Sequence, residues 1–229
     1  MARASTNHGN GAHHSHTSHK GRSNGSHRST KSGSRRGRRG SSINPQWLKD
    51  FLSEMLAVEK GGVQLYQKAL NELEHSELED RLNEFLNQTQ RHVELCTEML
   101  EAAGSDENYQ SPGAAAAEHK AEGLMSTQVP PEMIDLNNIE NLVLAETKDH
   151  WNWETLASIA RRIDDDELKR MALKAVSEVR KQEKTHLSWN EETLSKLAME
   201  SAMHAPAEAM DEDEKESQSM TDRDKGTEM

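Results

Sequence analysis

The stretch Gln182-Glu183-Lys184-Thr185-His186 places a carboxylate and an imidazole three residues apart. Apolar residues around it recur with helical spacing, so the two side chains lie one turn apart on the same helix face. Three earlier segments with helical spacing each bring one polar residue to their own apolar face, namely Glu59, His92 and Glu146. Acids and histidines from four helices make an unfavourable core unless something binds them. We interpret this pattern as a site for a pair of metal ions.

The 229 residues divide by composition into three parts. Residues 1–43 hold nine Lys or Arg, no Asp or Glu, and almost no large apolar residue. Such a segment cannot bury enough apolar surface to offset the entropy lost on ordering, so we predict a disordered basic arm. We also predict a disordered acidic tail at 203–229 and a folded domain at 44–202. The net charge of −12 therefore combines a basic arm with an acidic body.

The cysteine count and the hydropathy pattern restrict the compartment. Cys96 is the single cysteine, so the chain cannot form an internal disulfide, as is usual in the reducing cytoplasm. No apolar run approaches the length that spans a membrane, and the basic N-terminal region lacks the apolar segment of a secretory signal. We therefore expect a cytoplasmic protein without membrane contact.

The spacing of apolar residues predicts four helices, at about 45–73, 78–103, 138–162 and 164–197. The turns after the first and third helices are short, which makes the joined helices antiparallel neighbours. The connection at 104–136 is long, contains helix-breaking prolines and has room for one short helix at about 114–124. In the first helix, Gly61 and Gly62 each cost about 1 kcal/mol in helix propensity, which predicts the close approach of a neighbouring helix beside Glu59.

These residues resemble the ferritin-like di-metal carboxylate superfamily, which includes ferritins and rubrerythrins. The pattern of that family is a glutamate on the first and third helices and Glu-x-x-His on the second and fourth. The resemblance covers residues 46–200, and the metal ligands that it implies are Glu59, His92, Glu146, Glu183 and His186. The implied fold is all-α, a ferritin-like four-helix bundle with a long crossover between the second and third helices.

One family position is altered, since Thr89 stands three residues before His92, where the family has glutamate. Two divalent ions would then bring four positive charges to a site with three glutamates. Asp149 or a bound hydroxide could supply the missing negative charge, or a single ion could bind tightly, so Asp149 and Thr89 are candidate members of the metal shell. Tyr66 lies two turns beyond Glu59, as in the rubrerythrin branch, and the resemblance implies a catalytic role for it.

Carboxylate and imidazole ligands suit iron or manganese. The resemblance implies two iron ions and oxidation of ferrous iron by oxygen or peroxide, in iron storage or oxidative-stress defence. Such a protein would be a ferroxidase- or peroxidase-type oxidoreductase, and we expect it to form a homo-oligomer, a dimer or larger. Three alternatives stay open. They are a manganese catalase-like enzyme, a metal-free helical bundle that binds other proteins, and a DNA-associated stress protein whose residues 1–43 contact nucleic acid through charge.

Overall fold

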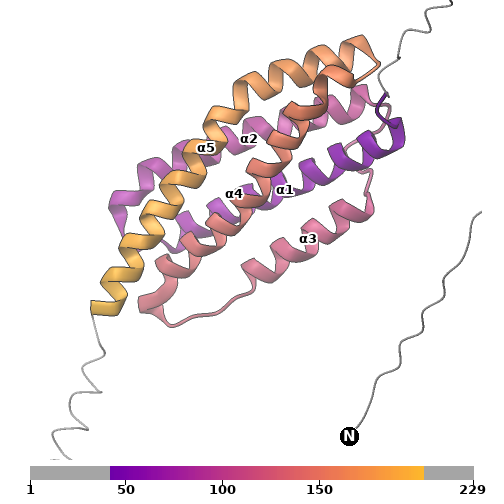
Figure 1. Cartoon of the computed structure of the whole chain (residues 1–229). Coiled ribbons are helices and arrows are strands. Elements are labelled where there is room, and N and C mark those ends of the chain that lie inside the picture. Colours follow the sequence, from indigo (N-terminus) through magenta and orange to yellow (C-terminus); the bar gives the residue numbers. More distant parts are fainter. Residues whose placement is uncertain (1–41, 204–229) are drawn as a thin grey trace, which may run out of the picture. The chain divides into compact units, whose positions relative to one another are not determined.

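In a computed structural model, which describes residues 42–203, the chain is helical over most of its length (Figure 1). The helices are α1 (Pro45–Glu72), α2 (Glu79–Ala102), α3 (Pro112–Met125), α4 (Ile134–Ile159) and α5 (Asp166–Met203). No strand occurs in the described range, so the predicted all-α class is confirmed. None of these helices is long and apolar enough to cross a membrane. The basic arm and acidic tail fall almost entirely outside the described residues.

Local sequence explains where the helices begin and end. The Asn44 side chain accepts hydrogen bonds from the first backbone N–H groups of α1, and Pro45 occupies its first position. Gly104 follows the end of α2 with a φ of 79°, a left-handed conformation that favours glycine. At the start of α5 the Asp165 carboxylate accepts from the backbone N–H of Leu168 at 2.8 Å.

The long connection between α2 and α4 contains α3, as predicted, and α3 packs along α1 (Figure 1). A Cβ atom added to Gly61 would lie 3.0 Å from the Cβ of Ala121 on α3. One added to Gly62 would lie 3.3 Å from the methyl group of Thr89 on α2. The two glycines therefore allow neighbouring helices to approach α1, as predicted. α4 begins before its predicted start at 138, because the 3-10 turn Pro131–Met133 leads directly into it.

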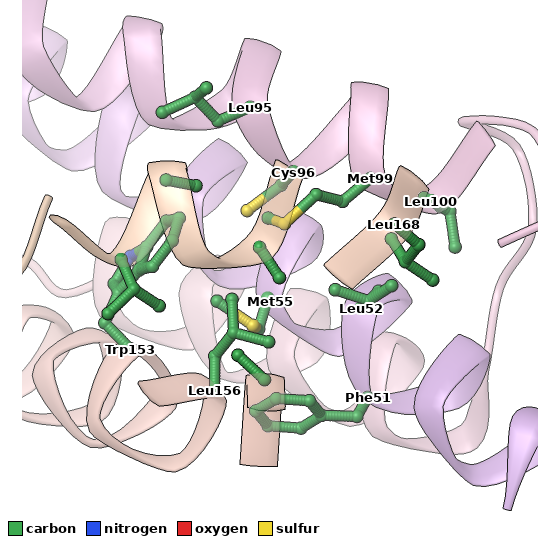
Figure 2. Packing of buried hydrophobic residues seen from close by; sticks show 14 of the residues in the cluster. Phe51, Leu52, Met55, Leu95, Cys96, Met99, Leu100, Trp153, Leu156 and Leu168 are labelled. Atoms are coloured by element: carbon green, nitrogen blue, oxygen red, sulfur yellow. The ribbon is translucent and has the colours of Figure 1, made fainter. Parts of the chain in front are cut away.

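Two apolar clusters fill the interior, and a polar layer lies between them along each long helix. The first cluster includes Leu52, Met55, Cys96, Met99, Trp153 and Leu156 (Figure 2). The second includes Leu65, Tyr66, Phe85, Leu142 and Leu197. On α1 the first cluster ends at Leu56 and the second begins at Leu65, with Glu59 between them. On α5 the corresponding limits are Val179 and Leu197, with Glu183 between them.

Candidate metal centre

Two groups of buried side chains meet in the polar layer. The first group is Glu59, His92, Asp149 and Glu183, and the second is Glu146, Glu183 and His186. Within each group the atoms able to bind a metal ion lie within 4.8 Å of one another. All of these residues are at most 5% exposed. The structure thus brings together the five residues that the resemblance implies as ligands and the candidate Asp149, and it places Glu183 in both groups.

The inner atoms of these side chains are buried without a hydrogen bond. They are Glu59 Oε2, His92 Nδ1, Glu146 Oε2, Asp149 Oδ1, both carboxylate oxygens of Glu183, and His186 Nδ1. Leaving one buried polar atom unpaired costs roughly 1–3 kcal/mol, and most such atoms in proteins have a partner. This concentration of unpaired acceptors is the arrangement expected where cations complete the coordination.

The outer oxygen of each terminal glutamate is held by an aromatic side chain. Trp153 donates its indole N–H to Glu59 Oε1 at 2.7 Å, and the Tyr66 hydroxyl donates to Glu146 Oε1 at 2.6 Å. Asn190 in turn donates to the Tyr66 oxygen at 3.1 Å. Each glutamate therefore has one oxygen held by a hydrogen bond and a second, buried oxygen without one. Trp153, a member of the first apolar cluster, therefore has a polar contact as well.

The outer nitrogen of each histidine is held by a glutamine. His92 Nε2 lies 3.0 Å from Gln182 Oε1, and His186 Nε2 lies 2.8 Å from Gln88 Oε1. Sequence reasoning missed both glutamines, although each stands four residues before a histidine in the same spacing, Gln-x-x-x-His. Contacts of this kind hold the ring orientation of metal-binding histidines.

The two halves of the chain mirror each other at this centre. Tyr66 follows Glu59 by seven residues and Trp153 follows Glu146 by seven, and each aromatic donates to the glutamate of the other half. The glutamines follow the same rule, since each contacts the histidine of the opposite half. The α1–α2 pair and the α4–α5 pair therefore supply equivalent parts.

The mirror relation fails at two pairs of positions, and one of them is Thr89. Asp149 and Glu183 bring carboxylates from the second half, whereas their counterparts in the first half are Gly62 and Thr89. The Thr89 hydroxyl donates to the backbone oxygen of Phe85 at 3.0 Å, and Thr89 belongs to neither group of metal-binding side chains. Asp149 brings a fourth carboxylate to the two groups, to which position 89 brings none.

Electrostatics in the absence of metal favours bound protons. Burial, followed by the charges of Glu183 and Glu59, raises the pKa of Asp149 well above its usual range. Burial and the nearby carboxylates likewise raise the pKa of Glu183. Burial lowers the pKa of His92, but the nearby carboxylates of Glu59 and Asp149 outweigh it and raise this pKa to about 9. Burial, reinforced by Glu146, raises the pKa of Tyr66, so its hydroxyl keeps its proton.

The donor set suits a pair of divalent cations. The two groups contain four carboxylates in total, Glu59, Glu146, Asp149 and Glu183. When ionised, their four negative charges would balance the four positive charges of two divalent ions. Carboxylate oxygens and imidazole nitrogens are ligands for iron, manganese and zinc, and the described part of the chain places no thiolate in either group. The side chains therefore fit a pair of metal ions, and Glu183 belongs to both of the groups that would hold them.

Comparison with known proteins gives one family. No curated protein and no solved structure matches the chain. The model of the family described as "Domain of unknown function (DUF892)" matches residues 45–203, which is most of the chain and contains every residue of both groups. The chain therefore belongs to the DUF892 family.

Proposed function

We propose that this chain is a ferritin-like di-metal protein that binds two iron ions and oxidises ferrous iron with oxygen or peroxide. The observation that carries the proposal is the set of buried, unpaired acceptor atoms in two groups that share Glu183. Bound iron would supply one-electron chemistry, in which ferrous iron is oxidised and the oxidant is reduced. The ferritin-like bundle is part of the proposal, and the order of two short turns around one long crossover supports it.

The chain's own residues would hold the ions, balance their charge and exclude water. Glu183, whose two oxygens have no hydrogen bond, would serve both groups, and each of the other residues would serve one of them. The apolar clusters on either side keep the centre dry, which strengthens its electrostatic interactions. Tyr66 holds a proton at its hydroxyl beside Glu146, which is the position proposed for its catalytic role.

The test is a titration of metal-free protein with ferrous ion under anaerobic conditions, followed by addition of peroxide or oxygen. We expect two bound ions per chain in the wild type and at most one in Glu183→Gln. Glu192→Gln, an exposed position on the same helix, is the matched control and should bind as the wild type does. A wild type that binds no divalent metal would favour the metal-free interaction protein instead. Elemental analysis of protein purified without added metal separates iron from manganese.

A further inference from the structure

The structure places one glutamine from each half of the chain against the histidine of the other half. Gln88 of α2 reaches His186 of α5, and Gln182 of α5 reaches His92 of α2. Both contacts join the Gln carbonyl oxygen to the histidine Nε2, and in both rings Nδ1 is the nitrogen that faces the acidic groups. Each glutamine can therefore influence which ring nitrogen of its histidine carries the hydrogen.

The orientation of the Gln88 amide is fixed by a third residue. Its Nε2 group donates to Glu84 Oε1 at 3.1 Å, and a carboxylate oxygen can only accept. The other end of the amide, the carbonyl oxygen, therefore faces His186, and this oxygen is also an acceptor only. His186 must then carry a hydrogen on Nε2, so in the neutral ring the lone pair lies on Nδ1. That is the atom 3.5 Å from Glu146 Oε1 and without a hydrogen bond.

The Gln182 contact gives the same result for His92. Its carbonyl oxygen lies 3.0 Å from Nε2, and His92 Nδ1 lies 3.1 Å from Glu183 Oε1 and 3.6 Å from Glu59 Oε2. A hydrogen on Nε2 leaves Nδ1 as the nitrogen that a cation can bind.

We propose that Gln88 and Gln182 are positioning residues, which fix each histidine in the tautomer that presents Nδ1 to the metal. The inference rests on the proposed metal binding but does not depend on which metal or oxidant is used. Loss of an outer partner of this kind typically lowers metal affinity by about 10- to 100-fold. The tautomer of each histidine would be set by a glutamine from the opposite half of the chain. The affinity of the centre for metal would therefore depend on the packing of α2 against α5.

The experiment compares two substitutions of similar length at each position. Gln88→Met and Gln182→Met remove the acceptor, whereas Gln88→Glu and Gln182→Glu keep one. Gln90→Met, at an exposed position on α2, is the matched control. Ferrous ion and zinc ion are titrated against a chelator of known affinity, and circular dichroism checks that each variant remains helical.

We expect the Met variants to bind both ions about 10- to 100-fold more weakly and the Glu variants to recover most of that loss. In the zinc-loaded protein labelled with nitrogen-15 histidine, NMR should show Nδ1 bound to metal and a slowly exchanging proton on Nε2. The Met variant at 88 should lose the slow exchange at His186. A purely space-filling role predicts equal losses for Met and Glu and unchanged proton exchange.

The possible outcomes separate this inference from the proposed function. Wild type that binds neither ion overturns both. Wild type that binds both ions, with Met variants equal to it or Met and Glu variants equally impaired, overturns the role of the glutamines alone. Binding through Nε2 in the wild type, seen directly in the NMR spectrum, also overturns it.

Discussion

Replacing Asp149 by asparagine should change stability and metal binding in opposite directions. In the metal-free protein Asp149 is 5% exposed and faces the carboxylates of its group, and burial raises its pKa. Asparagine has nearly the same shape without the charge. The metal-free variant should therefore be more stable than the wild type, because an acid held beside other buried acids opposes folding.

In contrast, the same substitution should weaken metal binding. Four carboxylates neutralise two divalent ions, and the variant leaves one positive charge uncompensated and one ligand weakened. The ligand atoms of the group lie within 4.8 Å of one another, and a unit charge about 4 Å away contributes about 4 kcal/mol at an effective dielectric constant of 20. At about 1.4 kcal/mol per tenfold, one of the two ions should bind roughly 1000-fold more weakly.

The assay combines thermal unfolding in the presence of a chelator with a competitive ferrous titration. Asp135→Asn is the matched control, since Asp135 is also on α4 and also 5% exposed. Its carboxylate accepts from the backbone of Glu74 and His75 and lies outside both metal-binding groups, so the variant should lose stability and keep its metal affinity. If Asp149→Asn destabilised the metal-free protein, or left both ions tightly bound, the assignment of Asp149 to the shell would be wrong.

Four further predictions concern His92, Thr89 and two helix glycines. The pKa of His92 rises from 6.5 to about 9, so protonated His92 stabilises the metal-free protein fully below pH 6.5. As the pH rises through 9, the free energy of unfolding should fall by about 3 kcal/mol, which thermal melts with a chelator would measure. Thr89→Glu adds a fifth carboxylate to a balanced set; it should lower the metal-free melting temperature and add no bound ion in elemental analysis. Gly123→Ala, where an added Cβ meets nothing within 4 Å, should stabilise by about 1 kcal/mol in denaturant unfolding. Gly61→Ala should gain less or lose stability, because its Cβ would lie 3.0 Å from Ala121.

The sequence predicted the helices and the polar layer because both depend on spacing along one helix. Glu59, Glu146 and Glu183 each interrupt an apolar face, and the helical period alone brings them to the interior. The helix class is confirmed, and the short helix in the crossover was also anticipated. The structure shows that these residues are buried and close together, and their binding of metal stays a prediction.

The relations across helices could not be read from one segment at a time. The sequence offered Asp149 as one of several sources of negative charge, and only the structure shows it buried in one group with Glu59, His92 and Glu183. The glutamine and aromatic partners are also contacts between distant residues. In the sequence these partners are marked only by spacings that occur in both halves, seven residues from glutamate to aromatic and four from glutamine to histidine. Those spacings indicate contacts only when the two halves are known to face each other.

The metal-binding groups are divided unevenly between the halves. Glu146, Glu183 and His186 all come from the α4–α5 half, whereas the other group takes Glu59 and His92 from α1 and α2. An ion in the first group would join residues about 90 positions apart in the chain, as the His92–Gln182 contact does. Such an ion would act as a removable cross-link that closes a long loop, and part of its binding free energy would become folding free energy. Metal supply would then set how firmly the two halves stay together, and a chelator would loosen the contact between them before it unwinds either one.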